Sequence, residues 1–238
     1  LCRCVLPEIG DNLGEAKKET GEAAGWPGDE NDGIVRKEEA GEAEDGKRRT
    51  GEVEAPTGER LTEESSVRVD LAQLYSPCAV LAEADSGRVL AEHNGQKRIY
   101  PASLTKLMTA VIVLEHVADL SETVTLSTEM FSLLYIRHAS VAGFEPEETV
   151  CIKDLLYGIL LPSGAECSIA CAEKIAGSEE AFAELMNQKA RELGMEDTHF
   201  CNATGLHEKE HFSTVCDMAV LLRYALQNDT LREILSCK

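Results

Sequence analysis

The chain has 238 residues, of which 43% are hydrophobic, so a sizeable domain with a packed core is expected. Its formal net charge of −20 argues against a nucleic-acid partner, which needs a basic face, and against docking on an anionic membrane surface. The apolar runs, such as 107–114, are far shorter than the ~18–20 residues that span a bilayer, so no membrane span is expected. No signal peptide is visible near Leu1.

Residues 1–66 differ in composition from the rest of the chain. They contain 18 acidic and 9 basic residues and 10 of the 18 glycines. Such a segment cannot bury enough apolar surface to offset the entropy of ordering it, so we expect a disordered acidic low-complexity segment. A charged helical stalk is the alternative, but the regularly placed glycines disfavour it.

From residue 67 onward the pattern is that of a globular domain, and we expect it to continue to residue 238. A turn signal at 85–87 between two apolar runs predicts a hairpin over 78–91. Further on, the apolar spacing predicts an extended piece at 122–126, a loop at 139–147, and helices at about 102–118, 152–161, 165–176, 178–193, 215–226 and 229–236. Two strands alone make a marginal sheet, so we expect completing strands that this sequence lacks.

The nine cysteines are odd in number and scattered in spacing. No C-x-x-C pair with a matching partner occurs, which argues against a zinc site, and we expect mostly buried free thiols. Cys167 and Cys171 lie four residues apart, as expected for two small core residues on one helix. The sequence therefore predicts neither a structural metal nor a cofactor.

The motif that carries chemistry is Ser103-Leu104-Thr105-Lys106, at the predicted start of an apolar helix. Residues three apart share one helical face, so the Ser103 hydroxyl and the Lys106 amine can come close together. A neighbouring base is what turns an unreactive serine into a nucleophile. A solvated lysine at a helix start is the alternative interpretation of this motif taken by itself.

Two further stretches accompany this motif, 160–166 (LLPSGAE) and 182–206 (FAELMNQKA through NATGL). Together with 101–108 they strongly resemble the serine D-alanyl-D-alanine carboxypeptidases, low-molecular-weight penicillin-binding proteins of the serine β-lactamase/transpeptidase superfamily. The resemblance covers about residues 70–238. It implies an α/β (α+β) fold in which an antiparallel sheet is flanked by a helical subdomain.

The resemblance also implies a role for each motif, since this family works through S-x-x-K, S-x-N and K-T-G. It makes Ser103 the nucleophile, Lys106 the general base and Ser163 a proton relay toward the leaving amine. For Ser163, a helix cap is a serious alternative that is compatible with the catalytic role. The backbone N–H of Ser103 would supply half of an oxyanion hole.

The chain departs from the family pattern at two points. Ala165 stands where the second motif has its asparagine, and a methyl group can bond neither the lysine nor the substrate amide. The adjacent Glu166, as a substrate-binding residue, or Cys167 is expected to compensate in part. No K-T-G follows the second motif. Arg49-Thr50-Gly51 looks similar but precedes S-x-x-K, so we do not interpret it as the third motif. The catalytic domain is therefore expected to be truncated at its C-terminus.

The stretch from His207 to His211 matches H-E-x-x-H, the pattern of zinc proteases. That chemistry needs both histidines on one face of a helix. No apolar helical pattern flanks this stretch, so we interpret it as a surface loop. Nearby, Asn202 and Gly205 are expected to shape a turn.

The resemblance predicts an enzyme that trims peptidoglycan stem peptides ending in D-Ala-D-Ala, with β-lactams as covalent inhibitors, outside the cytoplasmic membrane of a bacterial cell. Its alternative is a catalytically impaired homologue that binds penicillin or peptidoglycan, because Ala165 breaks the second motif. A β-lactamase is a third and weaker alternative, since no E-x-x-L-N motif is present.

Overall fold

The computed structural model describes residues 74–237, and the expectations for residues 1–66, for the 66/67 boundary and for Cys2 and Cys4 lie outside this range. It begins with a hairpin of β1 (Ala79–Ala82) and β2 (Val89–His93), paired antiparallel with Leu81 opposite Ala91. Gly87 has a φ of 75° in the connecting turn. The predicted hairpin is confirmed.

Seven α-helices and a second small sheet follow in the described part of the chain. A short 3-10 helix (Ala102–Leu104) leads directly into α1 (Thr105–His116). β3 (Thr123–Thr125) and β4 (Thr149–Cys151) then form an antiparallel pair. The remaining helices are α2 (Thr128–Ile136), α3 (Ile152–Leu160), α4 (Ala165–Ala176), α5 (Glu179–Glu192), α6 (Val215–Ala225) and α7 (Asp229–Leu235).

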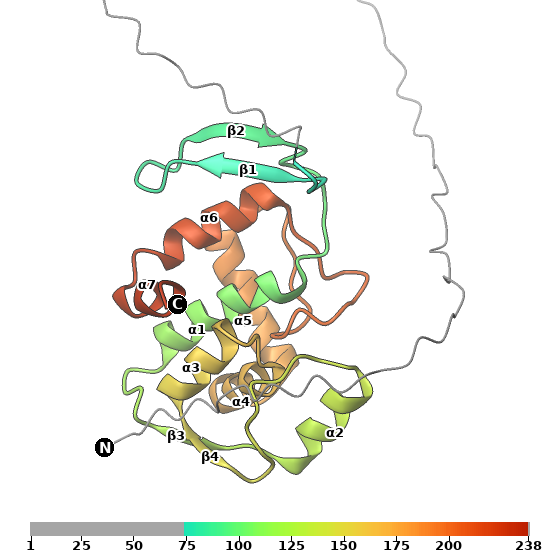
Figure 1. Cartoon of the computed structure of the whole chain (residues 1–238), viewed down its shortest axis with the longest axis vertical. Helices are drawn as coiled ribbons and strands as arrows, with labels where there is room; N and C mark the ends of the chain where they lie inside the picture. The colour runs from blue at the N-terminus through green and yellow to red at the C-terminus, as the bar shows by residue number, and fades with distance from the viewer. Residues whose placement is uncertain (1–73, 238) are drawn as a thin grey trace, which may run out of the picture. The chain divides into compact units, whose positions relative to one another are not determined.

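Helix α1 lies at the centre of the bundle and contacts α3, α4, α5 and α6 (Figure 1). It is apolar on nearly all sides, as is usual for a helix buried in a core, and Met108, Ile112 and Val113 are at most 1% exposed. Phe182 of α5 and Phe200 in the following loop are equally buried. Burial of each such side chain contributes roughly 1.5–3 kcal/mol to stability, so the position of α1 in the core is well fixed.

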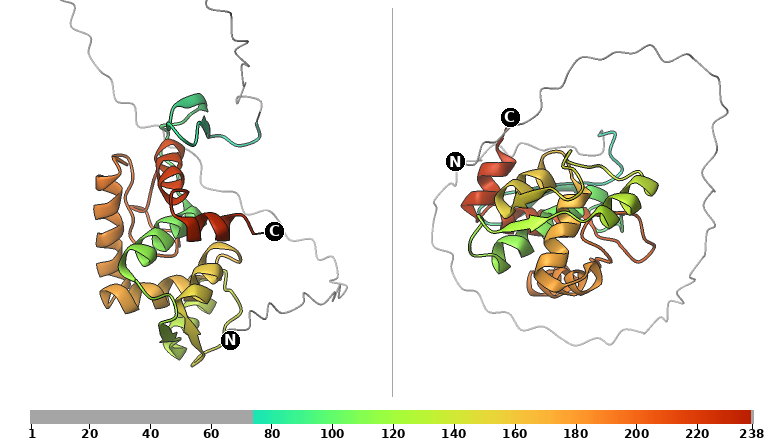
Figure 2. Two further views of the ribbon diagram at one scale, coloured as in Figure 1. Left: turned by 90° about the vertical axis from the view of Figure 1, so that its left-hand side faces the viewer. Right: turned by 90° about the horizontal axis from the view of Figure 1, so that it is seen from below.

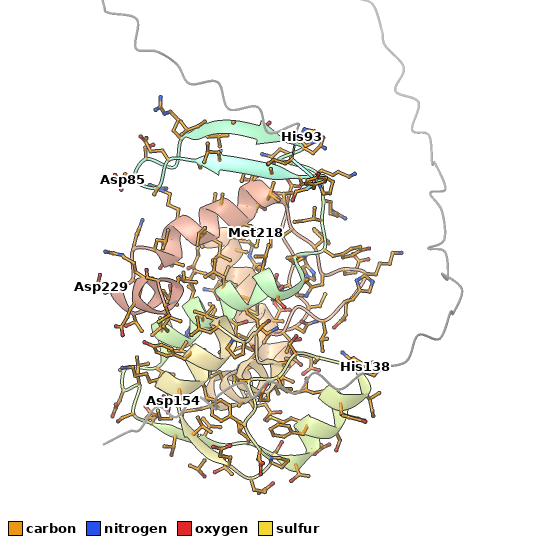
Figure 3. All side chains as sticks on the ribbon, viewed as in Figure 1. Asp85, His93, His138, Asp154, Met218 and Asp229 are labelled. Atoms are coloured by element: carbon orange, nitrogen blue, oxygen red, sulfur yellow. The ribbon has the colours of Figure 1, made fainter. Side chains whose placement is uncertain are left out.

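The two small sheets lie at opposite ends of this helical body, as Figures 1 and 2 both show. The β1–β2 hairpin lies over α6, and the β3–β4 pair lies beside α2. Arg223 of α6 donates a hydrogen bond of 3.0 Å to the carbonyl oxygen of Asp85, which marks the hairpin turn in Figure 3. The domain is thus mostly helical, with two separate two-stranded sheets in the residues described.

Most predicted helix ends agree with the structure, because local capping chemistry determines them. Helix α4 ends at Gly177, whose φ is 80°, and the Ser178 side chain accepts a hydrogen bond from the Ala181 N–H at the start of α5. Thr214 caps α6 in the same way. The last helix begins at residue 229, as predicted, and is capped by Asn228, whose side chain accepts hydrogen bonds from the N–H groups of Thr230 and Leu231.

Two elements and one general expectation differ from the sequence analysis. Helix α2 and strand β4 were not predicted. The expectation of mostly buried thiols is wrong for the residues described: Cys167 and Cys171 are buried, but Cys78, Cys151, Cys201 and Cys216 are partly exposed and Cys237 is exposed. None of the helices in 74–237 has the length and apolar character needed to cross a bilayer.

Candidate active site

Two serines that are 60 residues apart in sequence meet in a groove. Ser163 Oγ donates a hydrogen bond of 2.9 Å to Ser103 Oγ. Both serines and Lys106 line a groove of about 1120 Å³. Its walls come mainly from the β1–β2 hairpin and α6, with the 3-10 helix and the first turn of α1 between them in sequence, and most of the lining side chains are apolar. The structure therefore brings the three predicted catalytic residues to one cavity.

Within residues 74–237, two of the five non-glycine residues with a positive φ lie at or directly beside these serines. Ser163 has a φ of 64°, and Ala102, directly before Ser103, has a φ of 48°. A non-glycine residue in this left-handed region costs about 1 kcal/mol or more, and it persists only when the surroundings hold it. Next to Ser163, the N–H of Gly164 donates to the Gly158 carbonyl at 2.7 Å and the N–H of Ala165 donates to the Ser140 carbonyl at 2.8 Å.

Lys106 is buried in the first turn of α1, with 4% of its surface exposed. Within the described residues its Nζ donates to the carbonyl oxygen of Thr204, at 2.7 Å, and to neither serine. Burial lowers the pKa of Lys106 to about 8, while the negative charges of Glu166 and Glu179 act in the opposite direction. A lysine that is neutral for part of the time near neutral pH can accept a proton.

Ala165 and Glu166 do not line the groove. Ala165 is the first residue of α4 and is 1% exposed. Glu166 is fully buried, and its Oε1 accepts hydrogen bonds from the N–H groups of Ala142, at 2.5 Å, and Gly143, at 3.3 Å. Burial raises the pKa of its carboxyl group. In this structure the partner of Glu166 is a loop of the protein.

The loop that holds Lys106 was only partly recognised in the sequence. Asn202 shapes a turn, as predicted, because its Oδ1 accepts hydrogen bonds from the N–H groups of Thr204 and Gly205. The Thr204 carbonyl that receives Lys106 was missed, since a backbone acceptor leaves no signal in a residue pattern. Gly205 packs so closely on the backbone of Ala102 that a Cβ there would overlap the Ala102 carbonyl group.

The H-E-x-x-H stretch lies in a loop, as expected, and its two histidines have separate partners. The His207 ring packs edge-on against Tyr100, with ring centroids 4.5 Å apart. His211 is only 2% exposed, which the surface-loop interpretation did not predict. In residues 74–237 no group of three or more His, Cys, Asp or Glu side chains is arranged to hold a metal ion.

His211 instead connects this loop to the S-x-x-K turn. Its Nδ1 accepts a hydrogen bond from the Cys201 N–H at 3.1 Å, so the proton of the neutral ring is on Nε2, which lies 2.8 Å from Thr105 Oγ1. Burial lowers the pKa of His211 to about 4. Sequence analysis missed this role because the two residues are far apart in the chain.

This burial predicts an acid-sensitive contribution to stability. Between pH 6.5 and pH 4 the unfolded state binds the His211 proton and the folded state does not, so stability falls as the pH decreases through that window. With partial screening by solvent, we expect the free energy of unfolding to fall by about 1–2 kcal/mol between pH 6.5 and pH 4. Urea unfolding of the wild type and of His211→Gln should show the difference in free energy narrowing toward pH 4. A difference in free energy of unfolding that stays constant across this pH range would contradict the assignment.

The family model described as Peptidase_S11, D-alanyl-D-alanine carboxypeptidase, matches residues 64–237. The chain belongs to this family. It is 40% identical over 157 residues to D-alanyl-D-alanine carboxypeptidase DacF of Bacillus subtilis, covering 64% of this chain and 39% of that protein. It is 39% identical over 160 residues to DacC of Escherichia coli, covering 65% of this chain and 40% of that protein. The S11 chain thus spans about two fifths of the length of these curated relatives.

Solved structures support the same assignment for the fold. A point variant of the Streptomyces K15 DD-transpeptidase superposes with a TM-score of 0.65 at 27% identity, covering 66% of this chain and 64% of that one. The S11 domain therefore has the DD-transpeptidase/β-lactamase-like fold. The family that the motifs indicated is confirmed.

Proposed function

We propose that the protein is a serine D-Ala-D-Ala carboxypeptidase that removes the terminal D-alanine from peptidoglycan stem peptides. The observation that carries this proposal is the Ser103–Ser163 hydrogen bond beside a buried lysine, all at one groove. Membership of the S11 family supports the choice of substrate. We also propose that β-lactams acylate the same serine and that the protein acts in the bacterial cell envelope.

In this proposal each residue has one role in an acyl transfer. Lys106 Nζ takes the proton from Ser103 Oγ, and Oγ forms an ester bond with the carbonyl carbon between the two D-alanines. The C–N bond then breaks, and the departing amine receives this proton from Lys106 through Ser163 Oγ. Water hydrolyses the ester, which frees the shortened peptide and returns the proton to Ser103.

We further propose that the β1–β2 hairpin is part of a larger antiparallel sheet flanked by the helical subdomain. Two-stranded ribbons are marginally stable in water. Leu81, Val89 and Leu90 are between 39% and 52% exposed on this hairpin, which is unfavourable for apolar strand residues without a covering neighbour.

A covalent-labelling experiment tests the proposed nucleophile. We expect a fluorescent penicillin to label the purified protein at a single site, and Ser103→Ala to abolish the label because the attacking oxygen is gone. Ser163→Ala is expected to retain labelling at a rate reduced by about 10²–10⁴-fold, the usual effect of losing a proton-transfer group. Peptide mapping locates the site. Label that persists in Ser103→Ala would contradict the assignment.

A second candidate function is favoured by one observation, the methyl group at Ala165. A homologue without the amide of the second motif could be acylated and yet turn over poorly. D-alanine release from a stem pentapeptide separates the two functions. Release catalysed by the wild type and lost in Ser103→Ala supports the carboxypeptidase, whereas acylation without release supports the impaired homologue.

A further inference from the structure

Glu166 combines features that a structural carboxylate rarely has. It is fully buried in the first turn of α4, three residues after Ser163. Its Oε1 accepts hydrogen bonds from two backbone N–H groups of the 140–143 loop, but its Oε2 has no hydrogen-bond partner among the residues described. A buried carboxylate oxygen without a partner carries a desolvation cost, so a compensating function is expected.

The free oxygen of Glu166 lies on the side of the second serine motif. A Cβ built on Gly164 would lie 3.0 Å from Oε2, which places this oxygen against the residue that follows Ser163. The same short turn is tied to the loop by the hydrogen bond from the Ala165 N–H to the Ser140 carbonyl. Glu166 therefore lies against the turn that contains Ser163 and Gly164.

Glu166 also acts on Lys106 at a distance. Among the residues described, the two side chains form neither a hydrogen bond nor an ion pair, since Lys106 Nζ donates to the Thr204 carbonyl. Of the carboxylates whose charge raises the pKa of Lys106, Glu166 on α4 has a larger effect than Glu179 on α5. When Lys106 accepts a proton, its new positive charge is buried and needs a counter-charge.

We propose that Glu166 is a positioning residue for the serine–lysine pair and has two tasks. Its Oε1 holds the 140–143 loop against the turn of Ser163, and its negative charge stabilises the ammonium form of Lys106. This inference rests on the proposed function, and it gives the chain a substitute for part of the polar character that Ala165 lacks.

Glu166→Gln separates the two tasks, because an amide keeps a carbonyl acceptor and loses the charge. Lysine labelled with ¹³C at Cε allows the Lys106 pKa to be measured by NMR, with the signal assigned through Lys106→Arg. We expect a pKa of about 8 in the wild type and a value lower by about one unit or more in Glu166→Gln. Glu184→Gln, on the exposed face of α5, removes the same charge far from these contacts and should leave the value unchanged. An unchanged Lys106 pKa in Glu166→Gln would overturn the counter-charge role.

Hydrogen exchange at the Ala142 and Gly143 amides tests the clamp. We expect Glu166→Gln to retain most of the protection of these two amides from exchange. In Glu166→Ala the protection should fall by at least about tenfold, since alanine removes the hydrogen-bond acceptor. Unchanged exchange in Glu166→Ala would overturn the clamp. Neither measurement needs an active enzyme. A failure of penicillin to label Ser103 would reject the proposed function, whereas the Lys106 pKa and the amide exchange rates decide the two roles of Glu166.

Discussion

Replacing Lys106 by methionine is expected to slow the acylation of Ser103 by penicillin by about 10²–10⁴-fold, the range typical of a lost general base. Methionine is close to lysine in length and apolar, so it fills the same buried position without the amine. Stopped-flow or gel-based labelling with a fluorescent penicillin measures the rate. Lys153→Met, at an exposed position of α3, is the matched control and should label at the wild-type rate.

The same substitution has a predicted signature in stability that does not depend on catalysis. Lys106 has a pKa of about 8 when folded and 10.5 when unfolded, so between these values the unfolded state binds more protons. The stability of the wild type should therefore rise by about 2–3 kcal/mol relative to Lys106→Met as the pH increases from 8 to 10.5. Denaturant unfolding at about pH 7 and about pH 10.5 measures this difference. A constant difference, together with unchanged labelling, would show that Lys106 is neither desolvated nor the base.

Replacing Gly205 by alanine is expected to be the most damaging small substitution near the site. The new Cβ would overlap the carbonyl group of Ala102 and lie 3.0 Å from Thr105 Oγ1. Neither group can move without displacing the turn that carries Ser103. Overpacking of this kind costs typically about 1–3 kcal/mol, and the left-handed φ of 78° adds about 1–2 kcal/mol for any residue with a Cβ.

Gly177→Ala is a matched control for Gly205→Ala. Gly177 has a φ of 80°, but a Cβ there would meet nothing within 4 Å. We therefore expect Gly177→Ala to lose only the backbone contribution, about 1–2 kcal/mol, and to label normally. Gly205→Ala should lose more stability and at least about tenfold in labelling rate, because a displaced nucleophile reacts slowly. Equal effects of the two substitutions on stability and labelling would contradict the close packing of Gly205 on Ala102.

The sequence predicted correctly those turns and helix ends that are formed by residues close together in the chain. The turn at 85–87, the end of α4 at residue 176 and the starts of α5 and α6 agree with the prediction to within one residue. The turn and the caps at Gly177, Ser178 and Thr214 are each formed by residues within a few positions of one another. Helix α2 was not predicted, and the stretch 128–136 was assigned to no element. The small and polar residues at 139–147, just after it, indicate a loop and gave no sign of a helix before them.

The sequence by itself determined the family and the candidate nucleophile, because S-x-x-K and its companion motifs are contiguous in the chain. Only the tertiary structure decided what surrounds them. It brought Ser163 to Ser103, gave Lys106 the carbonyl of Thr204 as a partner, buried His211 against Thr105 and turned Glu166 toward a loop instead of the groove. These contacts join residues from 24 to 106 positions apart, and two of them use backbone atoms. Burial and distance in space set the pKa of each group, and neither can be predicted from the local residue pattern because both depend on the tertiary structure.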